Sequence, residues 1–144
     1  MTRTVLHATL VARRKDGLWS GMLLRGASGT GKSDLALRLL DRGWRLAADD
    51  RVAVWRDGAC VYGRAPEVLS GLIELRGQGV FAEDRVIPFA RIALVVDCAG
   101  TADLLERTPE PSRETLLGVA VPRILAQPLE PSAPARLDRL FALA

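Results

Sequence analysis

The fold of this chain is decided by one short stretch, Gly26-Ala27-Ser28-Gly29-Thr30-Gly31-Lys32-Ser33. The stretch matches the pattern GxxxxGK[ST] at every fixed position. In this pattern the glycines let backbone N–H groups close around phosphate oxygens, the lysine supplies a positive charge, and the serine hydroxyl holds Mg²⁺. A chance glycine-rich turn is the alternative interpretation. The stretch therefore predicts a nucleotide-binding loop, provided that a strand precedes it and a helix follows it.

The flanking sequence supplies that context. The apolar run Met22–Leu24 is typical of a buried strand. After the loop, apolar residues recur at helical spacing, and Gly43 behind Arg42 marks the end of the predicted helix. These apolar residues are Leu35, Ala36, Leu39 and Leu40. The order strand, loop, helix is the one that phosphate binding requires.

Length and composition limit the classes of protein. The 144 residues suit a single domain, 1–144, with one core. The 20 basic and 17 acidic residues give a net charge of +3, and Lys and Arg form no compact cluster with aromatic residues, so we expect no nucleic-acid surface. The sequence contains no run of about eighteen apolar residues, so it predicts no membrane-spanning helix. Cys60 and Cys98 lack CxxC spacing, which favours two reduced, buried thiols over a zinc site and indicates a cytoplasmic protein.

Alternating apolar residues predict strands on both sides of the loop. We expect a strand over Val5–Ala12, a charged turn over Arg13–Gly17, and a hairpin into the loop strand. The runs Val52–Trp55 and Ala59–Tyr62 flank Asp57-Gly58, which is a strong hairpin signal.

The second half of the chain adds a central strand and a terminal helix. Ile92–Val96 is almost continuously apolar, which is typical of a strand covered on both faces. Strands are also predicted over Trp44–Ala48, Leu72–Leu75 and Val119–Val121, and an amphipathic helix over Ala135–Ala144. Together these elements predict a mixed α/β fold with more strands than a doubly wound domain uses.

Four polar residues are candidates for chemistry. Asp49 and Asp50 follow an apolar run, so either is suited to bind Mg²⁺ or to act as a base, unless both belong to a surface turn. Glu74 lies in an apolar strand, where a buried carboxylate needs a cation such as Mg²⁺; an exposed carboxylate on an edge strand is the alternative. His7, the only histidine, is either structural or functional.

Three segments in order resemble the catalytic domain of HPr kinase/phosphorylase, which phosphorylates a serine of the phosphocarrier HPr. The loop is followed by Arg42–Val52, which is similar to the family sequence RGHRLVADDxV, and then by Leu72–Val80, which is similar to LLEIRGLGI. The resemblance implies an α/β fold: a single P-loop kinase domain of the HPr kinase / PEP carboxykinase-like type, with a mixed sheet and flanking helices. It covers the family's kinase domain and not its N-terminal domain.

The resemblance also implies roles for residues. Asp50 is the base that accepts the serine proton, and in the reverse direction the acid that returns it; Lys32 steadies the phosphates; Ser33 and Glu74 hold Mg²⁺. The segment Ile73–Ala82 is the catalytic signature. From the residues themselves we expect the partner surface near this segment, because a glycine-rich loop beside the acids can admit a protein serine. His7 falls where the family has a functional histidine.

The resemblance loosens further along the chain. Arg107 falls in the stretch that carries a catalytic arginine, and Arg113 is a competing candidate. Where the family has a PVRPGR-like segment, this chain has Pro128–Arg136 with Glu130 at the basic position, which puts the phosphorylase reaction in question.

The resulting hypothesis is an ATP-dependent, Mg²⁺-dependent serine kinase for an HPr-like phosphocarrier protein of the phosphotransferase system. The alternatives are a nucleotide-sensing module with little turnover and a P-loop kinase of another small substrate. The oligomeric state stays open, with a homo-oligomer among the alternatives.

Overall fold

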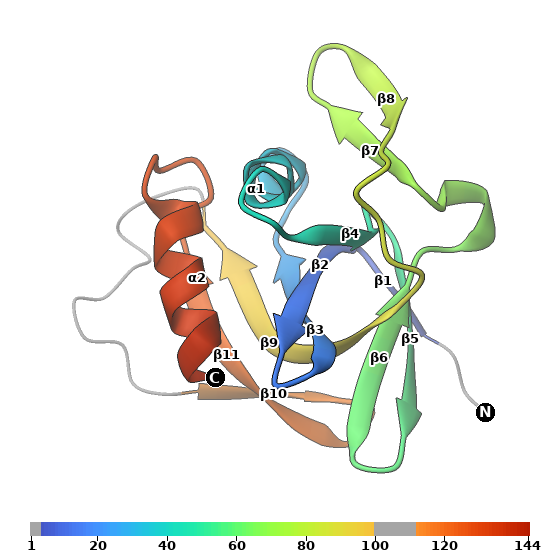
Figure 1. The fold of residues 1–144 in the computed structure, drawn as a ribbon, viewed down its shortest axis with the longest axis vertical. Coiled ribbons are helices and arrows are strands. Elements are labelled where there is room, and N and C mark those ends of the chain that lie inside the picture. Colours follow the sequence, from blue (N-terminus) through green and yellow to red (C-terminus); the bar gives the residue numbers. More distant parts are fainter. Residues whose placement is uncertain (1–3, 100–111) are drawn as a thin grey trace.

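The computed structural model describes residues 4–99 and 112–144, and within them a curled mixed sheet carries two helices (Figure 1). The strands are β1 Thr4–Leu6, β2 Ala8–Lys15, β3 Leu18–Arg25, β4 Arg45–Ala48, β5 Val52–Asp57, β6 Cys60–Arg64, β7 Leu72–Leu75, β8 Gly79–Ala82, β9 Ala90–Cys98, β10 Ser112–Leu116 and β11 Val119–Ala126. The helices are α1 Lys32–Leu40 and α2 Ala133–Leu143, with a 3₁₀ turn, η1, at Glu67–Leu69. The predicted mixed α/β fold is confirmed.

Strand β9 organises the main sheet. The nine-stranded sheet has the order β1-β5-β6-β9-β3-β2-β4, and β11 joins β9 and carries β10 at its outer edge. Strands β3 and β11 both run parallel to β9, whereas the other pairings are antiparallel. The central position predicted for Ile92–Val96 is therefore confirmed. The parallel pairing brings the carboxyl ends of β3 and β9 together, which is where α/β proteins place ligands.

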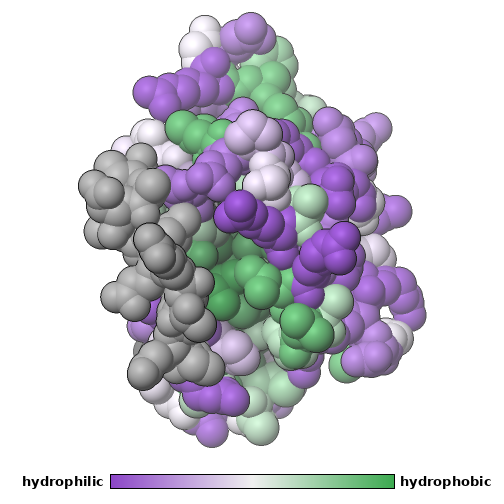
Figure 2. Space-filling model, turned by 90° about the vertical axis from the view of Figure 1, so that its left-hand side faces the viewer, coloured by the Kyte–Doolittle hydropathy of each residue, from purple (hydrophilic) through white to green (hydrophobic). Residues whose placement is uncertain are grey.

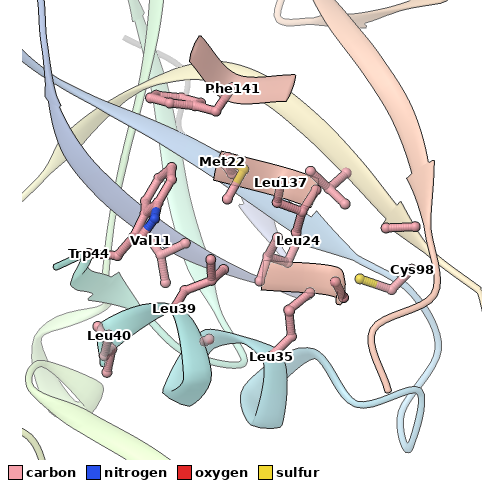
Figure 3. Packing of buried hydrophobic residues seen from close by; sticks show 14 of the residues in the cluster. Val11, Met22, Leu24, Leu35, Leu39, Leu40, Trp44, Cys98, Leu137 and Phe141 are labelled. Atoms are coloured by element: carbon pink, nitrogen blue, oxygen red, sulfur yellow. The ribbon is translucent and has the colours of Figure 1, made fainter. Parts of the chain in front are cut away.

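The core lies on both faces of the sheet. On one face, α1 and α2 pack over β2, β3 and β9, and Trp44 meets the ring of Phe141 edge-on at 4.8 Å (Figure 3). The indole N–H of Trp44 donates a hydrogen bond to Asp138 at 2.7 Å, so this large ring is buried without an unpaired donor. On the other face, the curl of the sheet encloses a second apolar cluster that includes Leu10, Leu23 and Val95. Both faces of β3 are thus covered, which holds the loop that follows it.

The single strand predicted over Val5–Ala12 is wrong. The chain bends at His7, because β1 pairs with β5 whereas β2 pairs with β3 and β4. The charged turn predicted over Arg13–Gly17 is also too long. Strand β2 continues to Lys15, and only Asp16 and Gly17, with φ of 52° and 79°, form the tight turn that hairpins favour.

Two further expectations change in detail. The short strand Val119–Val121 extends to Ala126, because β10 pairs along its first half and β9 along its second. The terminal helix begins at Ala133, two residues earlier than predicted. Both cysteines are free thiols, but only Cys98 is buried, so the expected burial of Cys60 is wrong.

Within the described ranges, neither helix is long and apolar enough to cross a membrane.

Candidate active site

A cavity of about 390 Å³ opens beside the glycine-rich loop. Its walls come from the bend between β1 and β2 and the start of β2, the loop and the first turns of α1, Asp50 two residues beyond the end of β4, and the β7–β8 hairpin. These segments are far apart in the sequence, and the sheet order brings them to one end of the molecule. Eight predicted site residues line this cavity: His7, Ser28, Gly29, Gly31, Lys32, Ser33, Asp50 and Glu74.

The loop has the backbone shape that its glycines predict. Gly26 has φ 152°, and a Cβ there would lie 2.8 Å from the carbonyl oxygen of Cys98. Gly31 has φ 103°, and a Cβ there would meet the Leu129 side chain at 2.7 Å. Larger residues would strain both positions. Helix α1 begins at Lys32, so the unpaired N–H groups of its first turn point toward the cavity end of the loop.

Lys32 lies across the loop. Its side chain is buried at 7% exposure, and its ammonium group donates hydrogen bonds to the carbonyl oxygens of Gly26 at 2.6 Å and Ala27 at 3.0 Å. The positive charge is therefore held next to the amide groups that would surround a phosphate.

Asp49 is the buried centre of the site, at 5% exposure. One carboxylate oxygen accepts hydrogen bonds from the hydroxyls of Thr9 at 2.8 Å and Ser33 at 2.7 Å. The other accepts from the backbone N–H of Glu74 at 3.0 Å. One carboxylate thus connects β2, the loop and β7. Because the Ser33 hydroxyl donates a hydrogen bond to Asp49, its lone pairs remain free to face a cation.

Asp50 points into the cavity instead. It has φ 68°, and the N–H of Arg51 donates to the carbonyl of Asp49 at 2.8 Å, which closes a three-residue turn. The turn brings a carboxylate oxygen of Asp50 to 2.9 Å from Nε2 of His7. Both side chains remain about half exposed, at 52% and 42%. The lone histidine and the second acid therefore form one pair at the cavity wall.

Glu74 lines the cavity, but its side chain is not buried as the surrounding apolar sequence predicted. The expected burial of its carboxylate is wrong, because β7 pairs only with β8 in a separate two-stranded sheet and the Glu74 side chain is exposed. Its position beside Ser33 in the cavity wall follows from the backbone bond to Asp49. Both residues predicted to hold Mg²⁺ thus line the same cavity.

An ion-pair cluster braces the strand ends beneath the loop. Asp97 accepts a two-pronged hydrogen bond from Arg25, at 2.8 and 3.0 Å, and another from Arg123. Burial opposes ionisation of Asp97, but the two arginines outweigh it, so its pKa lies below the usual range. The cluster joins the carboxyl ends of β3 and β9 to the middle of β11, directly before Gly26.

The two candidate arginines are not brought to the site by the described residues. Arg107 lies outside them, and Arg113 is exposed on β10, where it pairs with Pro122 of β11. Sequence reasoning missed Arg76, which lines the cavity and donates to the carbonyl of Gly29 at 3.4 Å, and Thr9, a buried polar residue in an apolar strand. For Thr9 the sequence offered one signal, a polar residue within the apolar run Val5–Ala12.

Strand β3, the loop and α1 have the strand–loop–helix architecture of phosphate-loop proteins. A family model described as the HPr Serine kinase C-terminal domain matches residues 2–132. The chain therefore belongs to the HPr Serine kinase C-terminal domain family.

Individual relatives carry related names. Proteins named HPr kinase/phosphorylase are 37% identical over 136 residues in Acidovorax sp. (strain JS42), with 87% of this chain and 42% of the relative covered, and 40% identical over 134 residues in Leptothrix cholodnii, with 85% and 40% covered. The chain thus spans about two fifths of these relatives' length. A solved structure titled Hpr(Ser) kinase/phosphatase from Coxiella burnetii matches with a TM-score of 0.78 and 27% identity, covering 95% of this chain and 87% of that one.

Proposed function

We propose that residues 1–144 form a single catalytic domain that transfers phosphate from ATP to a serine of an HPr-like phosphocarrier protein of the phosphotransferase system, in the cytoplasm. Family membership supports the reaction class. The observation that carries the proposal is the Asp50–His7 pair, which faces the same cavity as the phosphate loop.

The roles of the chain's residues follow from their positions. The amide groups of the loop and the first turn of α1 hold phosphate oxygens, and Lys32 exchanges its bonds to two loop carbonyls for bonds to the phosphates. Asp50 accepts the proton of the serine hydroxyl as its oxygen attacks phosphorus. The Nε2 atom of His7 contacts the Asp50 carboxylate at 2.9 Å, which fixes the direction of that carboxylate.

The donor set fits Mg²⁺. Ser33 and Glu74 offer a hydroxyl and a carboxylate oxygen at one cavity, and Mg²⁺ prefers oxygen ligands and completes its shell with water and substrate phosphates. When bound, Mg²⁺ neutralises charge on the transferring phosphate. Asp49 orients Ser33 and, through the backbone, Glu74.

The segment after β11 bears on the reverse reaction. Arg38 of α1 donates to the carbonyls of Pro128 and Glu130, and Leu129 packs on Gly31 of the loop. The Glu130 carboxylate is 3.5 Å from Arg136. Glu130 stands where the family has a basic residue, so this position offers no positive charge to bind inorganic phosphate, and we expect transfer toward the carrier to dominate. Release of pyrophosphate after phosphate is added to the serine-phosphorylated carrier would contradict this expectation.

Transfer of label from [γ-³²P]ATP to HPr in the presence of Mg²⁺ tests the proposal. Asp50→Asn should lower the transfer rate by about 10²-fold or more, because asparagine cannot accept the proton. Asp41→Asn is the control, since Asp41 is an exposed aspartate that pairs with Arg85 at 2.7 Å and does not line the cavity.

The outcomes separate the alternatives. Label on a serine of HPr that disappears in Asp50→Asn supports a protein kinase. Nucleotide binding without transfer to HPr or to other acceptors indicates a sensing module, and transfer only to a small molecule indicates a kinase of another substrate. An Asp50→Asn variant as active as the wild type would refute the assigned base.

A further inference from the structure

The β7–β8 hairpin stands away from the main sheet, above α1 and β4 (Figure 1). Three features attach it: Ile73 is buried at 2% exposure in the core beside α1, the N–H of Glu74 is bonded to Asp49, and Arg76 in its turn donates to the carbonyl of Gly29. Every residue of β8 is exposed. The rest of this hairpin therefore offers a free surface next to the cavity.

The pairing register defines which side chains share a face. Glu74 lies opposite Val80, and Leu72 lies opposite Ala82. Because side chains alternate along strands and directly opposed residues point the same way, these four residues form one face, which we call the Glu74 face. Val80 is 61% exposed on it, although Glu74 beside it lines the cavity. The wall of the cavity thus continues outward as an apolar surface.

Hydrophobic side chains are exposed at the upper end of the molecule in Figure 2, the end that the hairpin forms in Figure 1. Phosphate chemistry needs no apolar surface there, because the loop and the carboxylates supply its contacts. An exposed apolar surface beside a functional cavity is typical of a site for a macromolecular partner.

The charges around the cavity narrow the choice of partner. The Arg51 guanidinium is 3.8 Å from the Asp50 carboxylate, and Arg76 reaches the carbonyl of Gly29 at 3.4 Å. Both arginines are exposed. A serine that approaches Asp50 thus comes near exposed positive charge, so neutral or acidic groups around that serine are favoured over basic ones.

We propose that the Glu74 face is the docking surface for the acceptor protein, and that Val80 packs against an apolar surface next to the acceptor serine. This inference rests on the proposed function and adds to it the surface that selects a folded protein over a small molecule. Cross-strand pairing of Val80 with Glu74 places the docking contact and a proposed Mg²⁺ ligand on the same hairpin.

Val80→Ser tests the inference, with HPr as the acceptor. We expect the KM for HPr to rise roughly tenfold, because the variant removes apolar contact area at the interface. The KM for ATP should stay at the wild-type value, since Val80 does not line the cavity. Leu18→Ser is a matched control: Leu18 is 58% exposed, but it begins β3, whose eight residues separate it from the loop by about 26 Å.

Other results would overturn the inference. A wild-type KM for HPr in Val80→Ser, with normal labelling by the wild type, removes the docking role and leaves the proposed kinase intact. A rise that is equal for ATP and HPr indicates damage to the hairpin instead of lost docking. A wild-type protein that sediments as a dimer and becomes a monomer in Val80→Ser assigns the face to a second copy. If the wild type neither binds nor labels HPr, the docking role and the proposed function fall together.

Discussion

Replacement of Asp49 by asparagine separates the buried acid from the exposed one. The wild-type carboxylate accepts hydrogen bonds from Thr9, Ser33 and the backbone of Glu74. Asparagine has the same shape but only one acceptor oxygen. If that oxygen faces the two hydroxyls, the NH₂ group of the asparagine faces the N–H of Glu74. Both groups are donors, so neither finds an acceptor there. If the oxygen faces Glu74, Ser33 and Thr9 must accept hydrogen bonds from the NH₂ group.

The cost can be estimated for either orientation. A hydrogen bond to a charged group contributes about 1.5–3 kcal/mol, and a buried donor left without a partner costs about 1–3 kcal/mol. We therefore expect Asp49→Asn to lose about 2–4 kcal/mol of unfolding free energy, and its Tm to fall by roughly 6–12 °C. In the second orientation the Ser33 lone pair is used by the amide. Mg²⁺-dependent nucleotide binding should then weaken by about tenfold or more, since Ser33 is the ligand that we propose for the cation.

Two measurements check this prediction. Urea unfolding measures the loss of unfolding free energy. Nucleotide titrations with and without Mg²⁺ measure the loss of Mg²⁺-dependent nucleotide affinity. Asp41→Asn is again the control, because its exposed ion pair should contribute well under about 1 kcal/mol. The reasoning is refuted if Asp49→Asn loses less than about 0.5 kcal/mol, or if nucleotide affinity falls equally with and without Mg²⁺.

Two further predictions concern groups away from the cavity. Hydrogen bonds from Arg85 lower the pKa of Glu83 from 4.5 to about 2, so this pair stabilises the fold fully above pH 4.5 and progressively less as the pH falls toward 2. The difference in unfolding free energy between wild type and Glu83→Gln should shrink over that range, and a constant difference would contradict the assignment. Burial raises the pKa of the Cys98 thiol to about 12, so in the folded protein at pH 8 only the partly exposed Cys60 should react quickly with a thiol reagent. Two fast thiols per folded chain would be incompatible with this burial.

Local sequence patterns predicted the elements whose periodicity is strong. The loop octet, the helix after it and the apolar strand Ile92–Val96 each carry their own signal, and each forms as expected. The hairpin at Asp57-Gly58 forms for the same reason, since glycine allows the tight turn.

The errors arise where strand pairing over long distances decides the structure. Nothing in Val5–Ala12 shows that β1 pairs with β5 and β2 with β3, so the bend at His7 was not predictable from alternation. The exposure of Glu74 was not predictable either. The apolar run around Glu74 looks the same in sequence whether it forms a buried strand or a hairpin outside the main sheet. The family resemblance predicted functional roles for His7, Asp50 and Glu74. The sequence alone could not show that all three line one cavity.

The backbone at Asp50 explains how two adjacent acids come to lie in different environments, one buried and one at the cavity wall. If β4 simply continued, the side chains of Asp49 and Asp50 would point to opposite faces of the sheet. The chain instead makes a three-residue turn at Asp50, with φ 68°, in a region that costs a residue with a Cβ about 1 kcal/mol or more. Glycine would relieve that cost but would remove the carboxylate that meets His7. A strained aspartate at the cavity wall, next to a relaxed and buried one that holds Ser33, is therefore the arrangement expected where the position of the second carboxylate matters more than local stability.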